Sequence, residues 1–131
     1  MTYLLDVNAL LALGVVEHAF HERVGRWVAS MGGPRLATCS ITELGFVRVL
    51  AQAPVYGFTV TEARALLLRL KRGAPDWFKF IPDEHGISEL PAWVKMAKQI
   101  TDGHLSQVAS AHGAILATLD ENIPASYLIP K

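Results

Sequence analysis

Four acidic residues fall where predicted strands end or predicted helices begin. Asp6 ends an apolar run that we expect to form a strand, and Asp120 follows another such run. Glu43 and Asp102 lie in the first turns of predicted helices. In a parallel α/β sheet, functional groups collect where the strands' carboxyl ends meet the following loops and helices. We therefore expect these four carboxylates at one edge of the sheet, although they are far apart in the sequence.

The chemistry of such a group follows from its charge. Converging carboxylates repel one another, which raises their pKa values or destabilises the fold unless a cation is present. Hard divalent cations such as Mg²⁺ take oxygen ligands and keep several waters. A metal held in this way can activate water and stabilise charge on a phosphate. The four acids therefore predict a Mg²⁺ site, without His or Cys ligands, that suits phosphoryl chemistry.

Each acid also has a simpler explanation when it is considered alone. Residues 40–43 match a capping box, in which Glu43 would satisfy a backbone donor. Asp102 could stabilise a helix start through the helix dipole. Asp6 and Asp120 could be ordinary turn residues. Only the expected convergence of all four favours a metal site.

Apolar spacing predicts alternating strands and helices. Strands are expected at residues 2–7, 36–39, 77–81 and 114–119, with an edge strand at 127–129. Helices are expected at 20–31 and 41–52, at 63–70 after a cap at Thr59 or Thr61, at 91–100 beginning at Pro91, and from a cap at Thr101 to Gly113. This alternation implies an α/β fold with a mainly parallel sheet and helices on both faces.

Composition limits the class of protein. The 131 residues suit a single domain spanning 1–131, and 51% hydrophobic content excludes an intrinsically disordered chain. Cys39 is the only cysteine, so no intrachain disulfide can form, and the N-terminus does not resemble a signal peptide. The longest apolar run, residues 9–16, is too short to span a membrane. We expect a cytoplasmic protein with no membrane association.

Four short segments, in order, resemble the motifs of PIN domains. They are LLDVNALL at 4–11, TELGFVR at 42–48, TDGHL at 101–105 and ATLD at 117–120. The similarity covers nearly the whole chain and is greatest to the VapC-type toxins of toxin–antitoxin pairs. It implies a three-layer α/β/α sandwich with a central, mainly parallel sheet. One departure is Gly103, where the family commonly has a small residue such as Ala.

The resemblance also implies a function. It points to an endoribonuclease dependent on Mg²⁺ or Mn²⁺, with Asp6, Glu43, Asp102 and Asp120 as catalytic and metal-binding residues and with 3′-hydroxyl and 5′-phosphate products. Asn8 and Thr118 match supporting polar positions that would orient ligands or waters. The implied partners are RNA, a small antitoxin whose tail covers the acidic groove, and a second copy in a homodimer.

Two functions of other classes compete with this interpretation. An aspartyl phosphatase could use Asp6 as its nucleophile, but such enzymes normally carry a second carboxylate two residues later, where this chain has Asn8. A catalytically silent PIN-like module could bind RNA or protein, although silent relatives commonly lose acids and this chain keeps all four.

Candidate RNA-binding cations lie outside the acidic group. Arg48 follows Glu43 by five residues, and Arg69, Lys71 and Arg72 cluster at a helix end, where they could contact phosphates or simply be solvated. The chain has 12 basic and 12 acidic residues, so its net charge is zero. If the four candidate acids are set aside, 8 acidic residues remain against 12 basic ones. This balance is compatible with an acidic pocket in a mildly basic body.

The histidines give weaker signals. His18 and His21 are expected to share a helix face, where a role at the substrate rim is favoured over metal binding because no third ligand is near. His104 should point away from Asp102, two residues earlier on the same helix. His112 is expected to be a hydrogen-bonded core residue.

Overall fold

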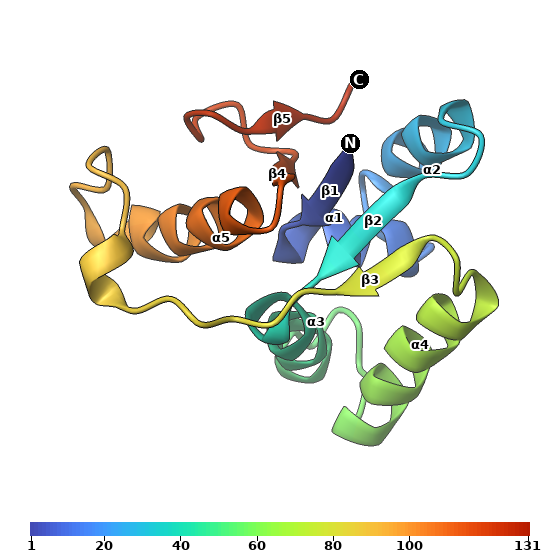
Figure 1. The fold of residues 1–131 in the computed structure, drawn as a ribbon. Coiled ribbons are helices and arrows are strands. Elements are labelled where there is room, and N and C mark those ends of the chain that lie inside the picture. Colours follow the sequence, from blue (N-terminus) through green and yellow to red (C-terminus); the bar gives the residue numbers. More distant parts are fainter.

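Five short parallel strands form the centre of the molecule in the computed structural model, which describes residues 1–131 (Figure 1). They are β1 (Thr2–Leu5), β2 (Arg35–Thr38), β3 (Phe78–Phe80), β4 (Ala114–Thr118) and β5 (Tyr127–Leu128). Their order across the sheet is β3-β2-β1-β4-β5, and every neighbouring pair is parallel. The predicted parallel sheet is confirmed.

Five helices cover the two faces of this sheet: α1 (Val7–Gly14), α2 (His21–Ser30), α3 (Ser40–Gln52), α4 (Val60–Gly73) and α5 (Ile100–Ala111). Successive strand residues point to opposite faces. Leu5 and Leu36 accordingly join a core shared with α1 to α4, whereas Leu4 and Ala37 join a smaller core shared with α5. The result is the predicted three-layer α/β/α sandwich.

The segment between β3 and α5 is less helical than expected. The predicted helix over residues 91–100 is wrong: only two short 3₁₀ turns form, η1 (Ile87–Glu89) and η2 (Ala97–Gln99). The Gln99 side-chain carbonyl accepts hydrogen bonds from the backbone N–H groups of Lys95 and Met96, at 2.8 and 3.0 Å, which satisfies donors outside a helix. Thr101 is not the cap of α5 but lies inside that helix, whose N-cap is Gln99.

Helix α1 was not predicted. Asp6 is its N-cap, and the apolar run that follows forms two turns of helix whose buried residues join the larger core. No helix in the structure has both the length and the apolar character needed to cross a bilayer.

Candidate active site

Three of the four acids meet in one hollow at the carboxyl edge of the sheet. Asp6 follows β1, Asp120 follows β4, and Asp102 lies in the first turn of α5. Together they line one hollow of about 430 Å³, whose wall also includes Asn8 and Thr118. Strands β1 and β4 are hydrogen-bonded neighbours, and this pairing brings Asp6 and Asp120 together across more than a hundred residues of sequence.

Asp6 is the most rigidly held of the three carboxylates. Only 7% of the residue is exposed. Its Oδ1 accepts a hydrogen bond of 2.8 Å from the backbone N–H of Ala9, as expected of a helix N-cap, and its Oδ2 accepts one of 2.5 Å from the Thr118 hydroxyl. A polar group with so little exposure must be hydrogen-bonded, and here both oxygens are.

The packing of α3 against the start of α1 helps to hold Asp6 in place. Gly45 of α3 is buried, and a Cβ at this position would collide with the side chain of Val7, the residue after Asp6. The glycine therefore permits α3 to lie directly against the segment that carries the aspartate.

Burial and mutual repulsion make this group of acids electrostatically unfavourable. Burial, together with the negative charges of Asp102 and Asp120, raises the pKa of Asp6 to about 6, although the bonds from Thr118 and Ala9 oppose the rise. Burial and the charge of Asp120 also raise the pKa of Asp102. A cation in the hollow would remove this penalty, because it favours the ionised carboxylates.

Thr118 and Asn8, the two supporting polar residues, both line the hollow. The Thr118 hydroxyl donates to Asp6 and accepts a hydrogen bond of 3.0 Å from the backbone N–H of Asp120, so it orders both acids. The Asn8 side-chain oxygen lies 2.9 Å from Nε2 of His18. Asn8 is thus fixed at the rim by a histidine from the α1–α2 connection.

The chemistry of the donors fits a hard cation. Asp6, Asp102 and Asp120 offer only carboxylate oxygens, which Mg²⁺ and Mn²⁺ prefer, and the hollow contains no Cys or His. No three His, Cys, Asp or Glu side chains stand close enough to enclose an ion by themselves. An ion bound here would need waters to complete its coordination, and Mg²⁺ usually keeps several.

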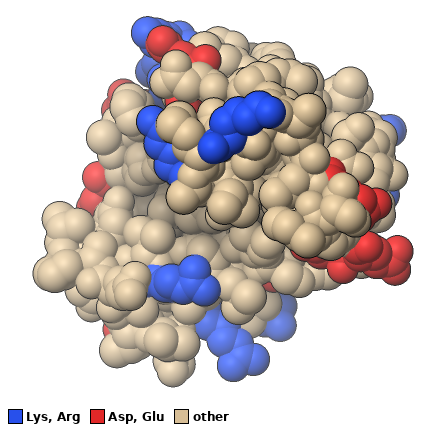
Figure 2. Space-filling view, turned by 90° about the vertical axis from the view of Figure 1, so that its left-hand side faces the viewer, with Lys and Arg blue, Asp and Glu red and all other residues tan.

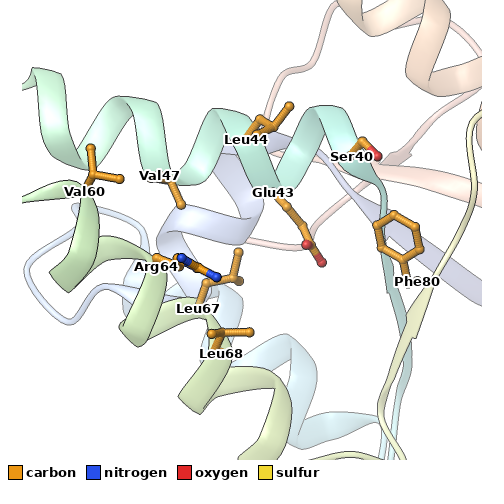
Figure 3. Close-up of a pocket in the computed structure, with 9 residues that line it drawn as sticks. All are labelled: Ser40, Glu43, Leu44, Val47, Val60, Arg64, Leu67, Leu68 and Phe80. Carbon is orange, nitrogen blue, oxygen red and sulfur yellow. The ribbon is translucent and has the colours of Figure 1, made fainter.

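Glu43 does not join the three aspartates in this hollow. Its Oε2 accepts hydrogen bonds from the Thr38 hydroxyl at 2.6 Å and from Nζ of Lys71 at 2.5 Å. Figure 3 shows its carboxylate pointing away from α3 into a separate groove, which is lined by residues of α3 and α4 and by Phe80. Glu43 therefore lies at the expected edge of the sheet, beside the end of β2, but its carboxylate lines a different groove from the one that the three aspartates share.

The simpler explanation of Glu43, as part of a capping box, does not hold either. Cys39, and not Ser40, is the N-cap of α3, and the Thr42 hydroxyl accepts the backbone N–H of Cys39 at 3.0 Å. Because the helix starts one residue earlier than a capping box at 40–43 requires, Glu43 lies one position too far along to cap it.

The candidate RNA-binding cations differ in their surroundings. Lys71 forms an ion pair with Glu43, and its Nζ lies 5.6 Å from the centre of the Phe80 ring. Arg48, Arg69 and Arg72 are exposed and form no ion pair. Figure 2 shows one face of the molecule on which Lys and Arg side chains lie on both sides of a hollow. Their role in RNA binding stays a prediction.

The histidine predictions had mixed outcomes. His18 and His21 do not share a helix face, since His18 precedes α2 and His21, its first residue, contacts the Ala12 carbonyl oxygen at 2.7 Å. His104 points away from Asp102, as expected, and its Nε2 lies 2.5 Å from Asp83. His112 is not a core residue; it is the half-buried C-cap of α5, 3.2 Å from the Pro82 carbonyl.

Sequence analysis missed a second hollow beside the aspartates. It has a volume of about 230 Å³ and shares Asp102, Asp120 and Ile123 with the first. Trp93, Met96 and Lys98 complete much of its wall. The predicted helix over residues 91–100 includes Trp93, and only the irregular path that this segment takes instead brings the side chain here.

Comparison with known proteins agrees with this fold. The family model described as "PIN domain" matches residues 3–126. Among similar proteins of Mycobacterium tuberculosis, Ribonuclease VapC38 is 35% identical over 124 residues, which cover 92% of this chain and 86% of the relative. Ribonuclease VapC44 is 35% identical over 129 residues, covering 94% and 89%, and Ribonuclease VapC29 is 35% identical over 125 residues with the same coverage. The chain therefore belongs to the PIN-domain family.

Proposed function

We propose that this protein is the toxin of a toxin–antitoxin pair and acts as a Mg²⁺-dependent endoribonuclease, with Mn²⁺ as a possible substitute. The observation that carries the proposal is the joint hollow of Asp6, Asp102 and Asp120, in which burial and like charge raise the pKa values of Asp6 and Asp102. Similarity to proteins named ribonucleases supports the choice of RNA as substrate.

The three aspartates have distinct parts in this proposal. A bound Mg²⁺ ion would activate water for attack on an RNA phosphodiester and offset the charge that develops on the phosphate. Asp6, which is buried and held at both oxygens, would be the fixed ligand, whereas Asp102 and the exposed Asp120 can adjust to the ion and its waters. Thr118 keeps Asp6 and the start of the Asp120 loop in register.

Glu43 has a different part from the one that the family resemblance implies. Its carboxylate is bound to Thr38 and Lys71, so it would hold α3, β2 and α4 together and not bind the ion. Lys71 would then be a structural partner of Glu43 and not a phosphate contact. Arg48, Arg69 and Arg72 stay available for RNA phosphates.

The partner and the location follow from the same proposal. A toxin that cuts RNA would act in the cytoplasm and would be held inactive by an antitoxin segment lying over the acidic hollow. The groove between α3 and α4 exposes Leu44, Val60 and Phe80, which are 61%, 61% and 47% exposed. These apolar side chains are compatible with a protein partner, including a second copy in a homodimer.

The phosphatase alternative finds no support in the geometry. Such enzymes use a second carboxylate, two residues after the nucleophile, to transfer protons. This chain has Asn8 at that position, whose amide cannot do so and whose side-chain oxygen lies 2.9 Å from Nε2 of His18.

The proposal is tested by incubating the purified protein with total cellular RNA in Mg²⁺, in Mn²⁺ and in the presence of a chelator. We expect fragments with 5′-phosphate ends in either metal, none with chelator, and none from Asp6→Asn. Fragments that persist with chelator, or that Asp6→Asn also produces, would show that another nuclease activity or a contaminant is responsible. The absence of metal-dependent fragments from the wild type would favour the silent binding module.

A further inference from the structure

The second hollow lies directly against two of the proposed metal ligands. It shares Asp102, Asp120 and Ile123 with the three-aspartate hollow, so a nucleotide next to a phosphate at the aspartates is within reach of it. Its remaining wall comes from the segment between Trp93 and Gln99 and from Asn122. No residue of this wall has a part in the proposed hydrolysis apart from the two aspartates.

The side chains in this wall have the chemistry that recognises a flat, uncharged ring. Trp93 is half-buried and offers an indole surface, and Met96 is 51% exposed and offers a polarisable thioether. Proteins bind unpaired RNA bases by stacking them on such groups and by contacting the base edges with polar side chains. Gln99 and Asn122 supply amides at the same hollow.

These polar groups are partly free to bind a ligand. The Gln99 side-chain oxygen is used by the backbone of Lys95 and Met96, which leaves its NH₂ group as a donor. The backbone N–H of Asn122 donates a hydrogen bond to the Asp120 carboxylate, but the Asn122 side chain makes no hydrogen bond within the protein. The ammonium group of Lys98 forms no ion pair.

Charge favours a base over a phosphate in this hollow. The wall carries two carboxylates and one lysine, so a second phosphate placed deep inside would be repelled by Asp102 and Asp120. A nucleobase carries no charge and meets no such penalty. Lys98, which is exposed, can contact a phosphate at the rim while the base lies inside.

Gly103 explains how the loop comes so close to the aspartates. This buried glycine lies on α5 next to Asp102, and a Cβ here would collide with Cγ2 of Val94. Because Gly103 has no Cβ, Val94 packs directly on the helix, and the adjacent Trp93 reaches the hollow. The residue at which this chain departs from the common family pattern therefore shapes the cavity beside the site.

We propose that this hollow, between the Trp93 segment and Asp102, Asp120 and Asn122, binds one nucleobase of the RNA next to the cleaved bond. The inference rests on the proposed ribonuclease function and adds a determinant of base preference to it. Trp93 and Met96 hold the ring, and the amides of Gln99 and Asn122 contact its edge.

Binding can be tested separately from cleavage in the Asp6→Asn background. Single-stranded RNA tetranucleotides are titrated in Mg²⁺ while tryptophan fluorescence is followed; the chain has three tryptophans, of which Trp27 is buried and Trp77 is 38% exposed. We expect quenching that persists in Trp77→Phe and disappears in Trp93→Phe. An abasic oligomer with the same phosphates should not quench. Equal quenching by the abasic oligomer, or quenching that survives Trp93→Phe, would overturn the inference.

The affinity and the cleavage pattern give two further measurements. Loss of one stacked base typically weakens binding about 5- to 150-fold, so Trp93→Ala should do so, and Trp93→Phe should retain most of the affinity. Asn122→Ala in the otherwise wild-type protein should change the ratio of bases found beside the cut bonds. An unchanged ratio, with unchanged affinity in Trp93→Ala, would overturn the inference. If the wild type cuts no RNA but the Trp93 quenching is present, the ribonuclease proposal fails and the base site stands.

Discussion

Replacing Asp6 with Asn should stabilise the folded protein at neutral pH in the absence of metal. The side chain keeps its shape, so the hydrogen bond from the Ala9 N–H to the side-chain oxygen can be retained. The change removes a buried negative charge that the fold, without a cation, holds at a cost. A gain in stability on loss of a proposed metal ligand would be typical of a site whose geometry is built for an ion.

The magnitude follows from the pKa of Asp6, which burial and the neighbouring aspartates raise from 3.8 to about 6. At 1.36 kcal/mol per pKa unit, this rise corresponds to about 3 kcal/mol. Because the folded state holds its proton more tightly, the contribution of Asp6 to stability is fully present below pH 3.8 and is lost as the pH rises through about 6. The Thr118 hydroxyl loses its acceptor in the variant, at a cost of about 1 kcal/mol. We therefore expect a net gain of about 2 kcal/mol at pH 7 to 8.

The assay is urea denaturation of wild type and Asp6→Asn from pH 4 to pH 8 in chelator. The difference in free energy of unfolding should increase across this range by about 2.4 kcal/mol, since a part of the full change has already occurred at pH 4. Addition of Mg²⁺ at pH 8 should stabilise the wild type more than the variant, because only an ion that binds the folded state shifts unfolding. A difference that does not change with pH would refute the assigned cost of burying Asp6. Equal stabilisation of both proteins by Mg²⁺ would refute its part in holding the ion.

Two further changes test the packing around the site. Lys71→Met should lower the free energy of unfolding by about 1–2 kcal/mol, because Glu43 loses its charged donor. A double-mutant cycle with Glu43→Gln should show that the two effects are coupled. Effects that simply add would contradict the ion pair. Gly103→Ala should lower the free energy of unfolding by about 1–3 kcal/mol, because the added Cβ overpacks against Val94. Adding Val94→Ala should restore much of this stability, as measured by thermal denaturation. A Gly103→Ala variant as stable as the wild type would contradict the close approach of Val94 to the glycine.

Sequence analysis predicted the sheet and most of its helices because those elements depend on local patterns. Short apolar strands alternating with helices implied a parallel sheet covered on both faces, and the structure agrees. The two helix errors have separate causes. The apolar run 9–16 carried no clear period, so α1 was missed. The spacing over 91–100 was helical, but Gln99 bonded to the loop backbone and tertiary packing of Val94 determined the path.

The site was predictable in part for the same reason. Asp6, Asp102 and Asp120 follow elements whose positions were correctly inferred, so the parallel topology brought them together. The direction of the Glu43 side chain depended on where α3 starts, and the helix begins one residue earlier than its capping pattern suggested. Its partner Lys71 is 28 residues away, and no local pattern reveals such an ion pair.

The central claim is that three aspartates, without Glu43, form the metal-dependent centre for RNA cleavage. The most direct measurement compares the initial rate of cleavage of one RNA in Mg²⁺ by Asp102→Asn and by Glu43→Gln, each verified as folded. We predict that Asp102→Asn loses cleavage and that Glu43→Gln retains it, because only Asp102 lines the hollow. Loss of cleavage in Glu43→Gln to the same extent, or retention in Asp102→Asn, would contradict the account.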